Sequence, residues 1–201
     1  MLVTLSGPSG SGKTTLIRGL QAACNARPLA SYTTRHRRKS EREFTEQTFL
    51  SRGEFDELEA RGEFLWTDQP YGRPYRYGTR AEDVRKALAS DALYTPPLTL
   101  KALPALWEYA QRHLMPLRVW FFYFYIEDLV ELRRRIVADR PDAERADLIA
   151  RLSSVHKENK LARKLTEIPL RHLDATLSKE KILAQALRIL RDANLIDPSS
   201  T

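Results

Sequence analysis

A glycine-rich stretch near the start of the chain has the residue types and the spacing of a phosphate-binding loop. Gly7, four further residues and then Gly12-Lys13-Thr14 satisfy the pattern G-x4-G-K-[ST] in full. Glycines let the backbone curl so that successive N–H groups point at phosphate oxygens. In such a loop the lysine reaches the β- and γ-phosphates, and the hydroxyl of Thr14 coordinates Mg²⁺. The pattern therefore predicts binding of a nucleoside triphosphate.

The segments on either side of this loop fit the same interpretation. Residues 1–5 are apolar apart from one threonine, which is typical of a central strand in a parallel sheet. After the loop, apolar residues recur at helical spacing at Leu16, Ile17 and Leu20. The helix N-terminus would add its partial positive charge at the phosphates. A chance glycine turn is the alternative, and the strand and helix that flank the loop argue against it.

Apolar periodicity along the rest of the chain predicts further strands and helices. Helical spacing is found over residues 51–61, 79–89, 129–136, 143–165 and 179–190, and residues 119–126 form a strongly apolar strand. Ser51, three residues before Glu54, is a candidate helix N-cap. Residues 68–79 are expected to form a loop, and residues 91–100 are ambiguous because two prolines interrupt a possible strand. This alternation predicts an α/β fold with a mostly parallel sheet flanked by helices.

The composition is that of an ordinary single-domain globular protein. Of the 201 residues 42% are apolar, and 33 Lys and Arg against 26 Asp and Glu give a formal net charge of +7. The basic excess indicates anionic partners (nucleotides, sugar phosphates or nucleic acid) or a genome that prefers arginine. A single cysteine, Cys24, excludes an intramolecular disulfide and suits a reducing cytosol. No apolar run approaches the roughly 20 residues of a spanning helix, and no cleavable leader is found, so we expect a cytoplasmic protein without a membrane partner.

Several segments together resemble the guanylate kinase family of nucleoside monophosphate kinases. The loop over residues 7–14 reads as that family's GPSGxGK[ST], and residues 31–38 are similar to its acceptor segment S-x-T-T-R-x-x-R. Further family motifs are matched at residues 63–65, 75–79 and 126–129 and at Arg151. The resemblance therefore spans most of residues 1–165. It implies a P-loop NTPase fold, ATP bound with Mg²⁺, and transfer of the γ-phosphoryl group to an acceptor that itself bears a phosphate.

The resemblance implies one kinase domain over residues 1–201 and three groups of site residues. The core would comprise about 1–30, 80–130 and 155–195, the acceptor-binding insert about 31–79, and the lid about 133–152. Thr14 would also bind the Mg²⁺ ion. The ATP-binding residues are Gly7, Ser9, Gly10, Ser11, Gly12, Lys13, Thr14 and Thr15. The acceptor-binding residues are Ser31, Arg35, Arg38, Tyr77 and Thr79. The catalytic residues, which would stabilise charge on the transferring group, are Lys13, Arg135, Arg140 and Arg151.

The chain departs from the family where guanine would be recognised. Trp66 stands where the family has a glutamate that reads guanine. Where the family has a strand that ends in aspartates, this chain has Tyr94 to Pro97. Gln47 replaces a tyrosine at the acceptor phosphate, and Asp68 is the carboxylate nearest to Trp66. A hydrogen-bonding site rejects a wrong partner because its buried polar groups go unpaired, so losing both carboxylates predicts an acceptor other than plain GMP. Trp66 is either a stacking surface for the acceptor or a core residue.

The acceptor itself stays open at this point. We expect a nucleotide. The alternatives are a sugar phosphate, as in the similar ribose 1,5-bisphosphate phosphokinase, a modified nucleotide, or a hydroxyl group in nucleic acid, which is possible but not favoured. A different class of function is a non-catalytic guanylate-kinase-like binding module, and the intact Gly12-Lys13-Thr14 speaks against it.

Overall fold

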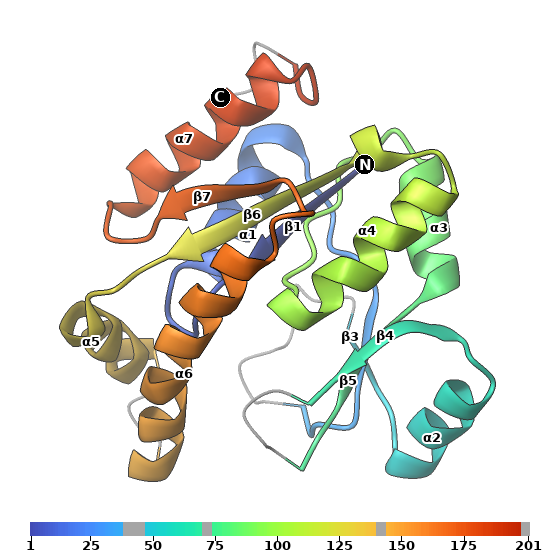
Figure 1. Ribbon diagram of the computed structural model, residues 1–201, viewed down its shortest axis with the longest axis horizontal. Helices are drawn as coiled ribbons and strands as arrows, with labels where there is room; N and C mark the ends of the chain where they lie inside the picture. Colours follow the sequence, from blue (N-terminus) through green and yellow to red (C-terminus); the bar gives the residue numbers. More distant parts are fainter. Residues whose placement is uncertain (38–46, 70–73, 140–143, 198–201) are drawn as a thin grey trace.

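The computed structural model describes residues 1–37, 47–69, 74–139 and 144–197 (Figure 1). Two residues assigned to the site from sequence, Arg38 and Arg140, lie outside these ranges. The described chain contains two β-sheets and the helices that cover them. Of the helices in these ranges, none is long and apolar enough to cross a lipid bilayer.

The larger core is built on a parallel sheet, sheet A, with the strand order β1-β6-β7. These strands are β1 (Leu2–Ser6), β6 (Val119–Tyr125) and β7 (Leu170–Asp174). Side chains alternate between the two faces of a strand, so a strand covered on both faces is apolar throughout. Val3 and Phe122 pack in one core cluster, while Leu2 and Phe121 pack in the other. The prediction of a parallel, doubly covered sheet is confirmed.

Helices cover both faces of sheet A (Figure 1). One core cluster takes side chains from α1 (Lys13–Cys24) and α7 (Lys179–Asp192). The other takes them from α3 (Ala81–Ala89), α4 (Leu103–Arg112) and the C-terminal part of α6 (Arg145–Lys164). Short 3-10 helices η2 (Leu100–Ala102) and η3 (Pro116–Arg118) flank α4 and β6. All the helices predicted from periodicity are present, and α4 is an additional one.

The segment that the sequence left ambiguous runs beside β1 as an irregular edge of sheet A. The N–H of Val3 donates to the carbonyl of Tyr94 at 2.8 Å, and the N–H of Leu98 donates to the carbonyl of Leu5 at 3.0 Å. Pro96 and Pro97 have no N–H, so a regular ladder cannot form there. The carboxyl end of this segment therefore lies next to the end of β1, where the phosphate loop begins.

Sheet B, with the order β3-β2-β5-β4, holds the middle of the chain. Its strands are β2 (Ser31–Thr33), β3 (Gln47–Phe49), β4 (Phe64–Asp68) and β5 (Tyr77–Arg80). The expectation of a loop over residues 68–79 is wrong at both ends, because Tyr77 pairs with Thr33 on one side and with Asp68 on the other. Pairing with distant strands thus overrides the local composition.

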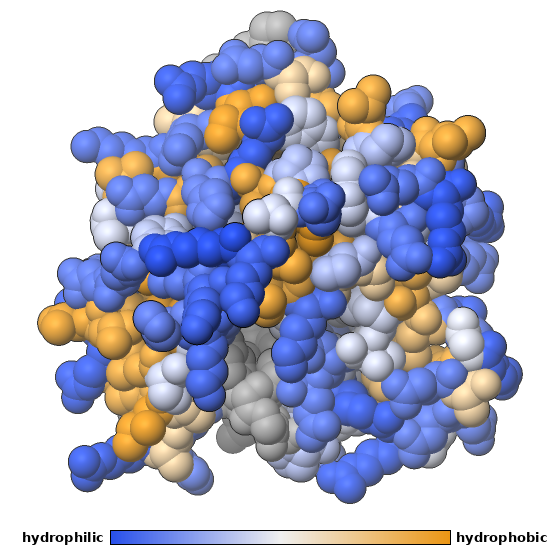
Figure 2. All heavy atoms as spheres, viewed as in Figure 1, coloured by the Kyte–Doolittle hydropathy of each residue, from blue (hydrophilic) through white to orange (hydrophobic). Residues whose placement is uncertain are grey.

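Two further helices flank the sheets. In α2 (Arg52–Ala60) the predicted N-cap is confirmed: the Ser51 hydroxyl accepts from the Glu54 N–H, and the Glu54 carboxylate accepts from the Ser51 N–H. Helix α5 (Leu129–Asp139) and the start of α6 lie on the opposite side of the molecule from sheet B (Figure 1). Figure 2 shows apolar side chains gathered over this part, where Leu129, Val130, Val137 and Ile149 are exposed.

Candidate active site

The phosphate loop between β1 and α1 has a backbone that requires glycine. Gly7 has φ of 143° and Gly12 has φ of 104°, in the region that favours glycine. At Gly7 a Cβ atom would lie 2.8 Å from the Cβ of Phe124, so the loop packs directly on β6. Gly12 is also the N-cap of α1 and places no side chain over the first N–H groups of the helix. These N–H groups form an anion site of the kind expected at a helix N-terminus.

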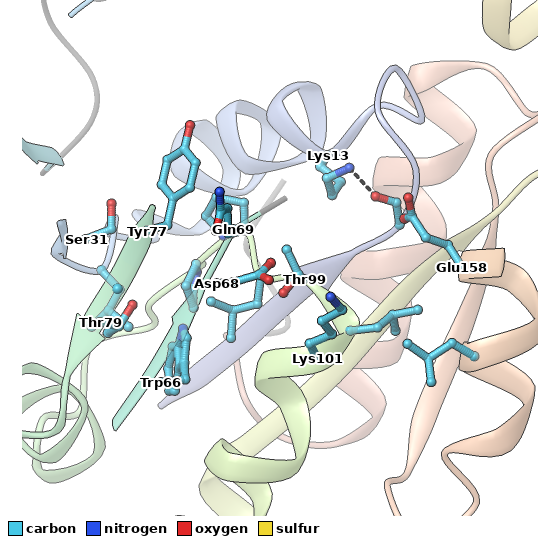
Figure 3. Close-up of a pocket in the computed structure, with 18 of the residues that line it drawn as sticks. Lys13, Ser31, Trp66, Asp68, Gln69, Tyr77, Thr79, Thr99, Lys101 and Glu158 are labelled. Carbon is cyan, nitrogen blue, oxygen red and sulfur yellow. Dashed lines mark hydrogen bonds between the residues drawn. The ribbon is translucent and has the colours of Figure 1, made fainter. Parts of the chain in front are cut away.

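The lysine of this loop folds back over the loop itself. The Nζ of Lys13 donates to the carbonyl of Gly7 at 2.5 Å (Figure 3) and to that of Pro8 at 2.7 Å. The side chains of Thr14 and Thr15 are exposed at the start of α1. Ser11 differs, because its side chain is fully buried and its N–H donates to the Pro8 carbonyl at 3.2 Å. Ser11 therefore closes the loop and offers no side chain to a ligand.

The arginines assigned to catalysis have different partners in the structure. Arg151 on α6 is only 4% exposed; its Nη1 donates to the hydroxyl of Ser9 in the loop, and its Nε donates to Asp147 at 2.9 Å. Arg135 on α5 donates to Glu131 at 2.7 Å and to the carbonyl of Ala175, after β7, at 2.6 Å. The structure thus brings Arg151, but not Arg135, into a hydrogen bond with the phosphate loop.

The acceptor residues come together through strand pairing in sheet B. Arg35 is 9% exposed, and its Nε donates to the hydroxyl of Tyr77, 42 residues away, at 3.1 Å. Its Nη2 donates to the side-chain oxygen of Gln47 at 2.9 Å, and its Nη1 donates to the His36 carbonyl at 2.8 Å. The guanidinium is therefore held in one orientation by β3 on one side and β5 on the other.

A cavity of about 630 Å³ connects the phosphate loop to these acceptor residues (Figure 3). Its polar lining comes from Lys13, Ser31, Gln47, Asp68, Gln69, Tyr77, Thr79, Thr99, Lys101, Ser154, Lys157 and Glu158. Its apolar lining comes from Leu29, Ala30, Trp66, Pro96, Pro97, Leu98, Leu100 and Leu161, with Gly7 and Gly78. Arg35 is not in this wall; it contacts the lining residues Tyr77 and Gln47 and lines a second hollow of about 600 Å³.

Trp66 combines the two roles that the sequence left open. The side chain is half-buried and packs against the core cluster beneath sheet A, and it also lines the cavity opposite Thr79. Pro97 lines the same cavity. An indole and a proline ring thus form part of the wall of this cavity.

Two carboxylates that the sequence did not assign to the site do face the cavity. Glu158 on α6 accepts a hydrogen bond from the Ser154 hydroxyl at 2.7 Å, and it lies close to Lys13 (Figure 3). Burial raises the pKa of Glu158, the positive charge of Lys13 opposes that rise, and the negative charge of Asp68 adds to it. Glu158 follows Arg151 by seven residues. Two helical turns put both on one face, and that spacing is the signal that could have identified Glu158.

The donor atoms at the loop fit a magnesium ion bound together with phosphates. Mg²⁺ takes few protein ligands and shares its other positions with water and phosphate oxygens. The exposed hydroxyl of Thr14 at the start of α1 is available as such a ligand, and Glu158 lies on the cavity wall near Lys13. Within the described ranges, no group of three or more His, Cys, Asp or Glu side chains could hold a metal by itself.

Known proteins share both the sequence of the first half and the fold. Residues 1–100 match the family model for guanylate kinase. The guanylate kinase of Nitrosomonas europaea is 36% identical over 91 residues, which are 45% of this chain and 44% of the relative. That of Anaeromyxobacter dehalogenans is 42% identical over 94 residues, 46% of this chain and 41% of the relative. The matching segment thus spans less than half the length of these relatives.

The whole chain matches a solved structure in fold. The guanylate kinase from Anaplasma phagocytophilum superimposes with a TM-score of 0.67 at 20% identity, covering 100% of this chain and 88% of that one. The first hundred residues, with the phosphate loop and the acceptor sheet, match the guanylate kinase family, and the complete chain has the fold of a guanylate kinase.

Proposed function

We propose that this protein is an ATP-dependent phosphotransferase that moves the γ-phosphoryl group of ATP to a phosphate-bearing acceptor, and that the acceptor is a nucleotide other than plain GMP. The observation that carries the proposal is the continuous cavity of about 630 Å³ with Gly7 and Lys13 at one end and Ser31, Tyr77 and Thr79 at the other. One continuous cavity can hold a donor and an acceptor phosphate together, and bringing reactants together in this way is a large part of catalysis.

At the donor end, the loop amides and Lys13 would bind the ATP phosphates, and Thr14 would hold Mg²⁺. When bound, Mg²⁺ would neutralise charge on the β- and γ-phosphate oxygens. Arg151 supports this assignment because its guanidinium already contacts Ser9 in the loop, where positive charge stabilises the transferring group. Arg135 and Arg140 are proposed to assist; Arg135 is bonded to Ala175 instead, and Arg140 lies outside the described residues.

At the acceptor end, Ser31 and Tyr77 supply hydroxyl groups to the acceptor phosphate. Arg35 supplies positive charge behind Tyr77 and Gln47, and a guanidinium matches the geometry of a phosphate dianion. Gln47 takes the place of the family's tyrosine and adds an amide group to this set. Arg38, the fourth member expected from the sequence, lies outside the described residues.

The rest of the acceptor cavity favours a nucleotide over a sugar bisphosphate. Its wall beside Thr79 is apolar, with Trp66, Pro97 and Leu98, and the flat face of a base can pack against such a surface. A sugar bisphosphate would leave that wall without a matching group. At Trp66 and Pro97 this wall offers no carboxylate to the N–H groups of guanine, which argues against plain GMP.

A screen with labelled ATP tests the proposal. The acceptors are nucleoside mono- and diphosphates, sugar phosphates that include ribose 1,5-bisphosphate, and oligonucleotides. We expect transfer to a nucleoside monophosphate other than GMP, loss of transfer in Lys13→Ala, and full activity in Lys160→Ala, a change of an exposed lysine on α6. Preference for GMP would overturn the base assignment, and preference for the bisphosphate would make the protein a sugar-phosphate kinase. If ATP is neither bound nor consumed, the protein is a binding module.

A further inference from the structure

Asp68 is a carboxylate in the cavity wall that the proposed reaction leaves without a role. It is the last residue of β4, it is half-buried, and its carboxylate points into the cavity (Figure 3). Its neighbour Thr67 faces the other way and donates to Glu59 on α2, as the alternation along a strand requires. Within the described part of the chain, the side chain of Asp68 makes no hydrogen bond or ion pair. An ionised carboxylate of this kind can only accept hydrogen bonds, so it offers several acceptor positions to a ligand.

The pairing of β4 with β5 fixes where Asp68 lies along the cavity. Trp66 is opposite Thr79, at the apolar end, and Asp68 is opposite Tyr77, whose hydroxyl meets Arg35 at the phosphate end. On its other side, the charge of Asp68 acts on Glu158 near the phosphate loop. Asp68 therefore lies between the wall proposed for the base and the groups proposed for the acceptor phosphate. In a nucleotide bound in that direction, this is the position of the sugar.

The chemistry of the position selects hydroxyl groups. A carboxylate repels phosphate oxygens, which excludes Asp68 as a phosphate ligand. The 2′- and 3′-hydroxyls of a ribose are neighbouring donors, and an acidic side chain is an effective partner for them. Resting on the nucleotide acceptor proposed above, we infer that Asp68 determines specificity by accepting hydrogen bonds from the ribose hydroxyls of the acceptor. The protein then prefers ribonucleotides to nucleotides that lack these hydroxyls.

Equilibrium binding tests this inference separately from turnover. The probes are AMP, CMP, GMP and UMP and the 2′,3′-dideoxy form of each, titrated by calorimetry into wild type, Asp68→Ala and Asp68→Asn. We expect wild type to bind the ribose form of its preferred nucleotide about tenfold or more tightly than the dideoxy form. The ratio of the affinity for the ribose form to that for the dideoxy form falls to about one in Asp68→Ala. It falls to an intermediate value in Asp68→Asn, since the amide oxygen still accepts a hydrogen bond but carries no charge. Affinity for the dideoxy form stays unchanged.

The control is Glu57→Gln, which removes a carboxylate from an exposed position on α2. We expect this variant to keep the full affinity ratio between the ribose and dideoxy forms. Melting curves of all variants establish that they are folded. Equal affinities in wild type, a ratio that survives in Asp68→Ala, or no binding of any of these nucleotides would each overturn the inference. The proposed function and this inference fail separately. If the affinity ratio depends on Asp68 but no phosphoryl group is transferred from ATP, the inference stands and the proposed function fails. If transfer to the ribose and dideoxy forms has equal kcat/KM, the inference alone is refuted.

Discussion

The guanidinium of Arg35 is oriented by side chains from the two strands that flank β2, Gln47 on β3 and Tyr77 on β5. A lysine at this position keeps the positive charge but loses the planar set of donors that matches a phosphate. We therefore expect Arg35→Lys to weaken binding of inorganic phosphate, and to raise KM for the acceptor, by about tenfold. Calorimetric titration with phosphate measures the first quantity, and steady-state kinetics with the acceptor found in the screen measures the second.

The matched control for this change is Arg37→Lys. Arg37 is exposed and its guanidinium lies over the ring of Phe49, at 4.8 Å from the centroid, while that of Arg35 lies 5.5 Å from the same ring. The two arginines thus share a neighbour but differ in burial and in hydrogen bonding. If Arg35→Lys keeps the full affinity for phosphate, Arg35 acts only through its charge. If both variants lose affinity to the same extent, the loss is not specific to the guanidinium held by Gln47 and Tyr77, and either result refutes the proposed positioning.

The raised pKa of Glu158 predicts how the stability of the protein depends on pH. Burial holds its pKa above the ordinary value of 4.5, so the folded state binds this proton more tightly than the unfolded state does. Its contribution to stability is thus full below pH 4.5 and is lost as the pH rises through the raised pKa. Glu158→Gln keeps an acceptor for the Ser154 hydroxyl and does not titrate. We expect the free energy of unfolding of the variant, relative to wild type, to increase from pH 4 to pH 7.

Urea unfolding at pH 4, 5, 6 and 7 measures this difference. Glu144→Gln, which changes an exposed carboxylate just before α6, serves as the control and should show no such trend. A stability difference between Glu158→Gln and wild type that stays constant over the range would show that Glu158 titrates as an ordinary surface carboxylate. Burial would then have no net effect on the pKa of Glu158.

At the scale of the elements, α6 carries two of the groups at the phosphate loop, Arg151 and Glu158, and is anchored by a buried polar contact. The hydroxyl of Tyr123 on β6 donates to the side-chain oxygen of Asn159 at 2.7 Å, and the Asn159 amide donates to the carbonyl of Ile126 at 2.9 Å. Tyr123 is fully buried and Asn159 is 5% exposed. This pair fixes the rotation of α6 and the direction in which its neighbour Glu158 points.

We expect Tyr123→Phe to cost about 1–3 kcal/mol of unfolding free energy, because the oxygen of Asn159 loses its donor while buried. Asn159→Ala should cost at least as much and should also lower kcat, since it frees α6. Chemical denaturation and kinetics measure both effects. The comparison is Tyr125→Phe: this tyrosine lies on the same strand but its hydroxyl meets Glu127 and Arg163 at the surface. A similar loss of stability in Tyr125→Phe would contradict the assignment.

The elements also show what local sequence can and cannot predict. The phosphate loop and the capped start of α2 were predictable because every group that forms them lies within a few residues of the next. Strand β5 was not, because Tyr77 is held by pairing with Thr33. The edge segment at Pro96 was not predictable either, because it is held by backbone hydrogen bonds to β1 and to Arg27. Asp68 escaped assignment for the same reason: a cavity formed by β4 and α6 exists only after the chain has folded. Trp66 could not be resolved because its ring serves both the core and the cavity.

For the molecule as a whole, the site is a junction between parts that are distant in sequence. The phosphate loop follows β1, Arg151 and Glu158 come from α6, and the acceptor groups come from sheet B (Figure 1). Direct contact between the loop and α6 includes one side-chain hydrogen bond, from Arg151 to Ser9. A triphosphate bound on the loop adds charge-assisted contacts to Arg151, so it should stabilise α6 together with α1.

This coupling predicts that a non-hydrolysable ATP analogue with Mg²⁺ stabilises the protein beyond the loop itself. At a hundredfold excess over Kd the linkage amounts to about 2.7 kcal/mol, which raises Tm by about 5–10 °C for a chain of this size. Hydrogen exchange should slow at the amides of α1 and also at those of residues 145–155 in α6. In Arg151→Ala the protection of α1 should persist while that of α6 is lost, because the loop still binds phosphate but no longer holds the helix. Equal protection of α6 in wild type and variant would mean that the nucleotide stabilises α6 without Arg151, which would then have no part in joining this helix to the phosphate loop.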